Sequence, residues 1–414
     1  MTAVADTLPL TETHVPQDQA TLAALVAGAF ASGTPIYPIG GGTSLDYGLS
    51  AAQEGLGISL AKLNRVVDYP AADMTITVEA GITLAELSAA LAAENQWLPI
   101  DAPQSSQATL GGLMATAFAG PRRYGYGTMR DYVIGVSAVD GRGTPFKAGG
   151  RVVKNVAGYD FCKLLTGSLG TLGIVTQVTL KVRPRPERSA FLVGDVRDAD
   201  SADKLLAGLV DTATTPAAIE WLVGSRWREH AGMGVAPAGC IGRLAVGLEG
   251  SAVEVDWMLA RLSDEWREAG LATSHILDGD RAAGLWTDLA EFPAEPGASL
   301  VLKASVLPSQ TLPYVKLVRE IDPAATVQAH AGNGVVIARF EKFEATGVSR
   351  DLIGRLHPAA TAASGSAVVL SNSLEGLTHP AVWGNATAAH RWMSKVKQQF
   401  DPRNLLNPGR FVHE

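Results

Sequence analysis

Cysteine is scarce in this sequence: only Cys162 and Cys240 occur among its 414 residues, far apart and without a C-x-x-C pair. A disulfide scaffold needs more cysteines than this, and a zinc site or iron–sulfur cluster held by thiolates needs closely spaced ones. The sequence therefore excludes a disulfide-rich secreted protein and argues against a cluster on this chain. A reducing, cytoplasmic setting is the default expectation.

Dense runs of Lys and Arg are also missing. The chain has 34 basic and 41 acidic residues, which gives a formal net charge of −7 at pH 7. Nucleic acids and anionic membrane surfaces are bound through concentrated positive charge. Neither kind of partner is expected, whereas a small molecule or another protein is compatible with this charge.

No stretch near the N-terminus is suited to crossing a membrane. Residues 19–45 carry no charge, but Pro35, Pro38 and three consecutive glycines interrupt them. The opening MTAVADTLPLTETH lacks a cationic start and an apolar core, so no signal peptide is expected. Any membrane association is expected to be peripheral, at the inner face and through partner subunits.

Glycine, by contrast, is abundant, with 44 residues that concentrate between Gly40 and Gly173. The proline-rich stretch RPRPER follows at 183–188 and is interpreted as a domain boundary. At this length two domains are the starting expectation. We predict a first domain over 1–186, a second over 187–375, and a C-terminal helix and tail over 376–414 that return to the site in the first domain.

The first region has mixed helices and short strands in irregular order. Apolar periodicity predicts a helix over 19–31, strands near 36–39, 57–60 and 74–79, a helix to about 95, and strands over 132–140 and 174–182. Thr83 and Glu86 have the spacing of a capping box before the second helix. The order differs from the regular alternation of a doubly wound sheet.

The second region repeats one order of elements twice. Strand, helix, strand, strand, helix, strand is predicted at 190–195, 202–211, 217–223, 240–248, 252–268 and 274–277. The same order follows at 299–306, 311–320, 325–330, 334–340, 347–356 and 366–371. Two β-α-β-β-α-β units predict a duplicated ferredoxin-like domain with one antiparallel sheet and helices on a single face. The fold class is therefore α+β, with a last helix at 387–400.

The first of three glycine-rich segments is PIGGGTSLDYG at 38–48. Three glycines after an apolar strand allow backbone N–H groups to converge on an anion such as a diphosphate, and two hydroxyl side chains follow. A tight glycine turn is an equally good interpretation of this segment alone. The sequence has neither G-x-G-x-x-G after a strand nor a P-loop, so neither of those nucleotide folds is supported.

Two further segments add glycine-lined surfaces. In TLGGLMAT, Thr109 is placed to cap a short helix whose first turn holds Gly111 and Gly112. In RVVKNVAGYDFCKLLTGSLGTLGIV at 151–175, three glycines spaced by three lead directly into a strand. A loop of this kind could contact a ring that has several hydrogen-bonding edges.

The combination of GGGTS, TLGGLMAT, KNVAGYDFCKLLTGSLGTLGIV and FDPRNLLNPGRF resembles the flavin-dependent oxidoreductases with a PCMH-type, vanillyl-alcohol-oxidase-like FAD domain. KNVAGYD with GSLGTLG is most similar to the FAD-binding subunits of bacterial glycolate oxidases. The dehydrogenase branch of the family usually has Glu where this chain has Leu169. The resemblance covers most of 36–186 and about 395–411.

The resemblance implies a set of FAD contacts. The diphosphate would be held by Gly40, Gly41, Gly42, Thr43 and Ser44. The ribityl chain and isoalloxazine would be lined by Pro103, Thr109, Gly111, Gly112 and Thr116. Backbone groups of Gly158, Gly170, Gly173 and Ile174 would contact the ring or the adenine end, and Asn407 would approach from the second domain. Relatives with covalent flavin attach it to a His near the diphosphate loop, and no His lies between His14 and His230, so noncovalent FAD is expected.

The candidate catalytic base is His330 in QAHAGNGVV, which partly matches the family segment G-H-x-G-D-G-N-x-H. Asn333 replaces the Asp, and the second His of the family segment is absent. A lone His at a strand end is also compatible with a purely structural role. The eight histidines form no H-x-H or H-x-x-x-H pair, so no catalytic metal is predicted.

The resemblance implies the FAD-binding subunit of a glycolate oxidase (glycolate dehydrogenase) complex. Such a subunit would oxidise glycolate or related 2-hydroxy acids to 2-oxo acids and pass electrons to an iron–sulfur subunit, beside a catalytic flavoprotein subunit. Two alternatives stay open. The chain could be a flavin-holding assembly subunit without turnover, which the altered HAGNG segment favours, or a stand-alone D-2-hydroxy-acid (D-lactate-like) dehydrogenase.

Overall fold

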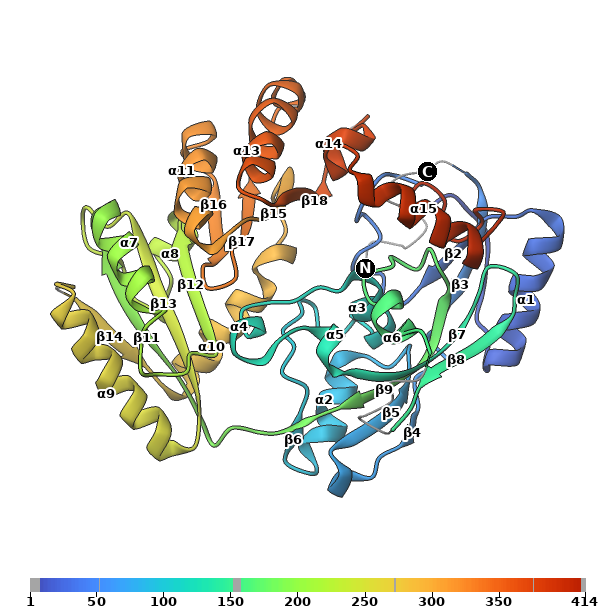
Figure 1. Cartoon of the computed structure of the whole chain (residues 1–414), viewed down its shortest axis with the longest axis horizontal. Helices are drawn as coiled ribbons and strands as arrows, with labels where there is room; N and C mark the ends of the chain where they lie inside the picture. The colour runs from blue at the N-terminus through green and yellow to red at the C-terminus, as the bar shows by residue number, and fades with distance from the viewer. Residues whose placement is uncertain (1–7, 52, 152–157, 272, 375, 411–414) are drawn as a thin grey trace. The chain divides into compact units, whose positions relative to one another are not determined.

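The computed structural model describes residues 8–51, 53–151, 158–271, 273–374 and 376–410, which can be followed by colour in Figure 1. Contacts between Cα atoms group the chain into two compact units. The first unit takes residues 1–119, 128–185 and 385–414, and the second takes 120–127 and 186–384. Residues 120–127 and 376–384 thus belong to the second unit.

The described residues of the first unit form three sheets: a parallel one ordered β1-β3-β2, an antiparallel one ordered β4-β5-β9-β7-β8, and the pair β6-β10. Its strands are β1 (Leu10–His14), β2 (Ile36–Ile39), β3 (Gly55–Ser59), β4 (Val66–Asp68), β5 (Thr75–Glu79), β6 (Gln96–Trp97), β7 (Val133–Val139), β8 (Pro145–Gly149), β9 (Ile174–Lys181) and β10 (Arg183–Pro184). Its helices are α1 (Gln19–Ser32), η2 (Ala71–Asp73), α2 (Leu84–Ala92), α3 (Leu110–Thr116), α5 (Met129–Tyr132), α6 (Phe161–Leu165) and α15 (Ala388–Phe400).

Local signals in the sequence account for the ends of these helices. The predicted capping box is confirmed: the Thr83 side chain accepts from the Glu86 backbone N–H, and the Glu86 carboxylate accepts from the Thr83 backbone N–H. Helix α1 starts at an Asp18 cap and ends at Gly33, whose φ of 76° favours glycine. Strand β1 was not predicted, because LTETH has little apolar character.

The second unit contains one antiparallel eight-stranded sheet, ordered β14-β11-β13-β12-β16-β17-β15-β18. Its strands are β11 (Arg188–Val196), β12 (Ala218–Val223), β13 (Gly242–Gly250), β14 (Ser274–Leu277), β15 (Leu300–Ser305), β16 (Thr326–His330), β17 (Val335–Phe340) and β18 (Ser366–Asn372). Its helices are α4 (Arg123–Tyr126), α7 (Ala199–Gly208), α8 (Ser225–Arg228), α9 (Ala252–Glu268), α10 (Gly279–Glu291), η3 (Phe292–Ala294), η4 (Pro308–Gln310), α11 (Thr311–Ile321), α12 (Ala345–Gly347), the π-helical η5 (Val348–Leu356), α13 (His357–Ala362) and α14 (His379–Trp383).

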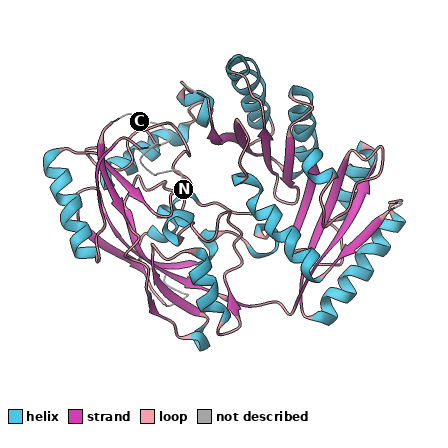
Figure 2. Cartoon of the chain, turned by 180° about the vertical axis from the view of Figure 1, so that it is seen from behind, coloured by secondary structure: helices cyan, strands magenta, loops and turns pink. Residues whose placement is uncertain are grey.

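The strand order confirms the predicted duplication. Numbered within its own half, the first half runs 4-1-3-2 and the second 2-3-1-4, so two ferredoxin-like units join edge to edge through β12 and β16. Figure 2 shows the sheet as a continuous row of strands with helices alongside. The α+β class is confirmed as well.

The expectation of helices on a single face of this sheet was wrong. Trp286 of α10 packs on Phe191 of β11, with ring centroids 4.4 Å apart, whereas Trp266 of α9 packs against Gly194 of the same strand. Because residues 191 and 194 point to opposite faces of a strand, α9 and α10 cover opposite faces. Helix α10 was not predicted.

In the described part of the chain, no helix combines the length and apolarity needed to cross a lipid bilayer.

Candidate functional site

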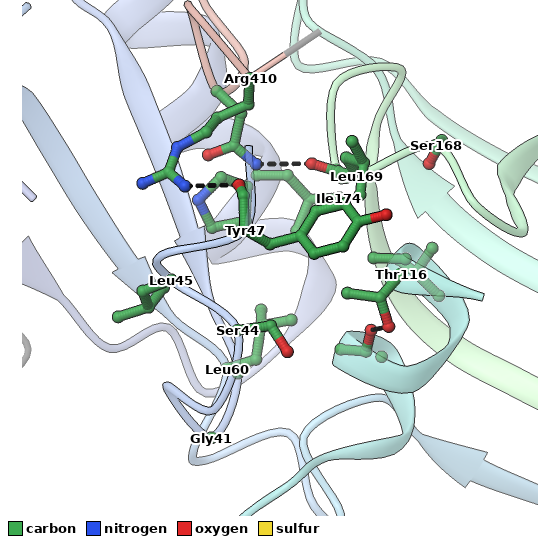
Figure 3. Close-up of a pocket in the computed structure, with 18 of the residues that line it drawn as sticks. Gly41, Ser44, Leu45, Tyr47, Leu60, Thr116, Ser168, Leu169, Ile174 and Arg410 are labelled. Carbon is green, nitrogen blue, oxygen red and sulfur yellow. Dashed lines mark hydrogen bonds between the residues drawn. The ribbon is translucent and has the colours of Figure 1, made fainter. Parts of the chain in front are cut away.

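A pocket with about 950 Å³ of space, part of it open to solvent, lies within the first unit (Figure 3). Its walls come from the loop after β2, from α3, from the loop before β9 and from the C-terminal tail. Twelve of the residues singled out from the sequence line it: Gly40, Gly41, Gly42, Thr43, Ser44, Gly111, Gly112, Thr116, Gly170, Gly173, Ile174 and Asn407. Four segments far apart in the sequence therefore meet at one pocket.

Pro103, Thr109 and Gly158 are not among the lining residues. Thr109 caps α3 as predicted, because its hydroxyl accepts from the backbone N–H of Gly112 at 3.3 Å. Thr109 therefore stabilises α3, whose residues line the pocket. Gly158 is exposed, and residues 152–157, which include the Lys154-Asn155 pair of KNVAGYD, lie outside the described residues.

The glycines after β2 are required by close backbone packing. A Cβ on Gly41 would lie 1.7 Å from the carbonyl oxygen of Gln107, and one on Gly40 would lie 2.3 Å from the Thr109 hydroxyl. A side chain at Gly41 would displace the Gln107 backbone, and one at Gly40 would displace the Thr109 side chain. The pocket floor is therefore bare backbone, which is what a nest of N–H donors for an anion requires.

The loop before β9 is held in an unusual backbone conformation. Leu169 and Gly170 have φ angles of 54° and 67°, in the left-handed region that favours glycine. The buried Thr171 hydroxyl donates to the Ser168 carbonyl at 2.7 Å and closes the turn. Leu169 lines the pocket with an apolar side chain.

The C-terminal tail belongs to the first unit, so Asn407 reaches the pocket from within that unit and not from the second domain. Its side-chain amide donates to the Leu169 carbonyl at 2.8 Å (Figure 3). The buried Lys397 ammonium donates to Asp401, to the Thr171 carbonyl and to the Leu406 carbonyl at 2.7, 2.9 and 3.0 Å. These bonds fasten the tail to the loop before β9.

Several lining residues were not predicted, among them Tyr47 and Arg410. Burial raises the pKa of Tyr47 to about 12, so the phenol is neutral at physiological pH. Arg410 donates to the Tyr47 carbonyl at 2.7 Å. Both residues lie inside the quoted motifs SLDYG and NPGRF, but nothing in the spacing separates them from neighbours that face elsewhere.

The donor set suits an elongated anionic ligand with an aromatic part. Glycine N–H groups and the Ser44 hydroxyl offer donors, Arg410 offers a positive charge, and Leu45, Leu60 and Ile174 provide apolar wall. FAD has this combination of a diphosphate and flat ring systems. The residues of the pocket therefore fit FAD.

The second unit holds the predicted catalytic candidate, His330, at the end of β16. Its Nδ1 lies 2.8 and 2.9 Å from the two carboxylate oxygens of Glu220 on β12, and the Gln328 amide donates to the same carboxylate at 3.0 Å. Glu220 and His330 are 0% and 1% exposed. The buried Nε2 of His330 has no hydrogen-bond partner among the described residues.

Two cations of the second unit, Lys303 and Arg123, are close enough for one to affect the pKa of the other. Strand alternation puts Lys303 of β15 on the same sheet face as His330. Burial lowers the pKa of Lys303, and the nearby charge of Arg123 lowers it further. Burial also lowers the Arg123 pKa, and its Nε is unpartnered. Within the described ranges, no carboxylate lies at ion-pair distance from either cation. Arg122, the neighbour of Arg123 in the chain, pairs with Glu249 at 2.8 Å.

Residues 13–149 match a family model described as an FAD binding domain. The glycolate oxidase subunit GlcD of Bacillus subtilis is 26% identical over 398 residues, covering 91% of this chain and 83% of that protein. The D-lactate dehydrogenase of Archaeoglobus fulgidus is 27% identical, covering 96% and 90%. The glycolate oxidase subunit GlcE of Escherichia coli is 42% identical over 128 residues, which are 31% of this chain and 37% of that protein.

A solved alkyldihydroxyacetonephosphate synthase matches with a TM-score of 0.68 and 18% identity, covering 96% of this chain and 75% of that one. At this identity the likeness shows a shared fold. Together, the family match over residues 13–149, the similarity to these relatives over nearly the whole length and the glycine-lined pocket show that the chain carries a PCMH-type FAD-binding domain and is an FAD-dependent oxidoreductase.

Proposed function

We propose that this protein oxidises small 2-hydroxy acids to 2-oxo acids with noncovalently bound FAD, and that glycolate is the substrate to test first. The observation that carries the proposal is the buried Glu220–His330 pair. The Nε2 atom of His330 has no hydrogen-bond partner among the described residues, and His330 lies on the same face of the sheet as Lys303. Relatives over most of the chain are named as glycolate oxidase and D-lactate dehydrogenase proteins. Both names describe 2-hydroxy acids as substrates.

Oxidation of a 2-hydroxy acid asks three things of the protein and its cofactor. FAD, when bound, supplies the acceptor for the two electrons that leave the α-carbon. A positioned base must take the hydroxyl proton, and a cation must hold the carboxylate. In this proposal His330 is the base and Lys303, with Arg123, holds the carboxylate.

Glu220 determines which nitrogen of His330 can act. A carboxylate facing Nδ1 keeps the proton on that nitrogen and leaves the lone pair on Nε2. Nε2 is therefore the atom that would receive the hydroxyl proton. Glu220 would also stabilise the imidazolium that forms.

Two names among the relatives are those of oxidase subunits. We propose that the chain works in a multi-subunit glycolate oxidase, beside a catalytic flavoprotein subunit and an iron–sulfur subunit that takes the electrons. Cys162 and Cys240 are both buried and single, so a cluster would sit on another chain. A stand-alone D-2-hydroxy-acid dehydrogenase and an assembly subunit without turnover are the competing possibilities.

The test compares glycolate with glycolamide, which keeps the hydroxyl but has no carboxylate. Wild-type protein with its partners should be reduced by glycolate far faster than by glycolamide, and Lys303→Met should remove most of that preference. His330→Gln should slow reduction by both compounds alike. If Lys303→Met leaves the preference for glycolate intact, Lys303 does not hold the carboxylate.

A further inference from the structure

Arg410 is the one charged side chain among the described residues that line the pocket of the first unit. It is 6% exposed and lies three residues after Asn407 in the tail. Figure 3 shows its side chain beside Tyr47, with the bond to the Tyr47 carbonyl drawn as a dashed line. A buried arginine therefore lines a pocket whose other polar groups are uncharged.

The contacts of Arg410 use only part of the hydrogen-bonding capacity of its guanidinium. A guanidinium offers several N–H donors in a fixed fork, and the Tyr47 carbonyl takes one of them at 2.7 Å. Asp46 is close enough for its charge to raise the pKa of Arg410 against the lowering by burial, but it forms no ion pair with it. Burying a cation without a partner is unfavourable, which makes an anionic ligand the natural complement.

The glycine loops supply N–H donors but no formal charge to balance a diphosphate. We infer that Arg410 binds the diphosphate of FAD and supplies the positive charge that the glycine-rich loops lack. The inference concerns the cofactor alone, so it stands or falls independently of the substrate. The competing explanation is that Arg410 only fastens the tail to Tyr47.

The test uses the full chain stripped of flavin and measures binding by calorimetry. Arg410→Gln should weaken FAD and ADP, which share the diphosphate, by about 10- to 100-fold, the range of a charge-assisted hydrogen bond. Riboflavin, which has no phosphate, should bind with unchanged affinity. Equal weakening of riboflavin, FAD and ADP would show that Arg410 acts only through the tail, and unchanged affinity for ADP would also overturn the inference.

A second measurement does not depend on any ligand. If Arg410 only fastened the tail, Arg410→Gln would lower the unfolding midpoint of the flavin-free chain, whereas a diphosphate ligand can be replaced without that loss. Arg403→Gln is the matched control, because Arg403 is exposed on the same tail, binds the Phe30 carbonyl and does not line the pocket. It should leave the affinities for all three ligands unchanged.

Discussion

The side-chain amide of Asn407 donates a hydrogen bond to the backbone carbonyl of Leu169, 238 residues earlier in the chain, at 2.8 Å. Asn407 itself has a φ of 47° and Leu169 one of 54°. The tail and the loop before β9 therefore hold each other in a conformation that neither segment would adopt alone. The wall of the FAD pocket depends on this pairing of two distant segments.

Gly41→Ala is expected to abolish stable FAD binding. The added Cβ would overlap the Gln107 carbonyl at 1.7 Å, so the loop after β2 must move away from the segment that precedes α3. The measurement is the amount of flavin that copurifies with the chain.

Gly28→Ala is the control for Gly41→Ala, since a Cβ at this exposed position in α1 meets nothing within 4 Å. It should retain FAD and raise the free energy of unfolding by about 0.5–1 kcal/mol, because alanine favours helix. Full flavin content in Gly41→Ala would refute the close-packing argument.

Lys397→Met should destabilise the first unit by roughly 3–5 kcal/mol, the cost of leaving one member of a buried pair alone. Asp401 would lose its cation, and the Thr171 and Leu406 carbonyls would lose a donor. Urea unfolding measures the change. Lys395→Met on the exposed side of the same helix should be close to neutral, and equal effects of the two substitutions would contradict the role of the buried network.

Lys303→Met should stabilise the second unit at neutral pH while it impairs use of glycolate. The folded-state pKa of Lys303 lies below its ordinary value of 10.5, so the unfolded chain binds the proton more tightly than the folded one. The resulting penalty is fully present below the folded pKa and disappears as the pH rises through 10.5. The gain from Lys303→Met should therefore be largest at neutral pH and shrink toward about pH 10. A gain that does not change with pH would argue against burial of the charged ammonium.

Glu220→Gln should lower the rate of flavin reduction by about 10²- to 10⁴-fold, because the amide no longer fixes the proton on Nδ1 of His330. The KM for glycolate should change much less, since Glu220 is not placed to touch substrate. Asp195→Asn is the control, as this carboxylate is paired with Arg243 elsewhere on the sheet. If both variants, once folded and loaded with FAD, are reduced at the wild-type rate, the proposed role of Glu220 is wrong.

Much of the second unit follows from local patterns in its sequence. Strand alternation and helical periodicity predicted the two β-α-β-β-α-β units because each half is a short, self-contained order of elements, and the structure gives the strands of the first half the order 4-1-3-2. Helix α10 was missed, although Ala282, Leu285, Trp286 and Leu289 are buried at helical spacing, because Gly279 and Gly284 lower the helical signal. The position of α10 on the face of the sheet opposite α9 could not be predicted from the repeat, because the second β-α-β-β-α-β unit was not predicted to contain a corresponding helix.

The sequence predicted those parts of the pocket in which the backbone conformation or close packing requires glycine. Gly40, Gly111 and Gly170 stand out because close packing or a left-handed conformation demands glycine. Arg410 and Glu220 carry no such signal. Arg410 meets Tyr47 across 363 residues of sequence, and Glu220 meets His330 from a neighbouring strand, so only the folded chain reveals their places.

The most direct test of the proposed function is the visible spectrum of the purified, FAD-loaded protein, recorded without oxygen before and after addition of glycolate and then D-lactate, with and without its partner subunits. The account predicts an oxidised-flavin spectrum that is bleached by a 2-hydroxy acid and is restored by an electron acceptor. A flavin spectrum that no 2-hydroxy acid changes, even with the partners present, would contradict the account.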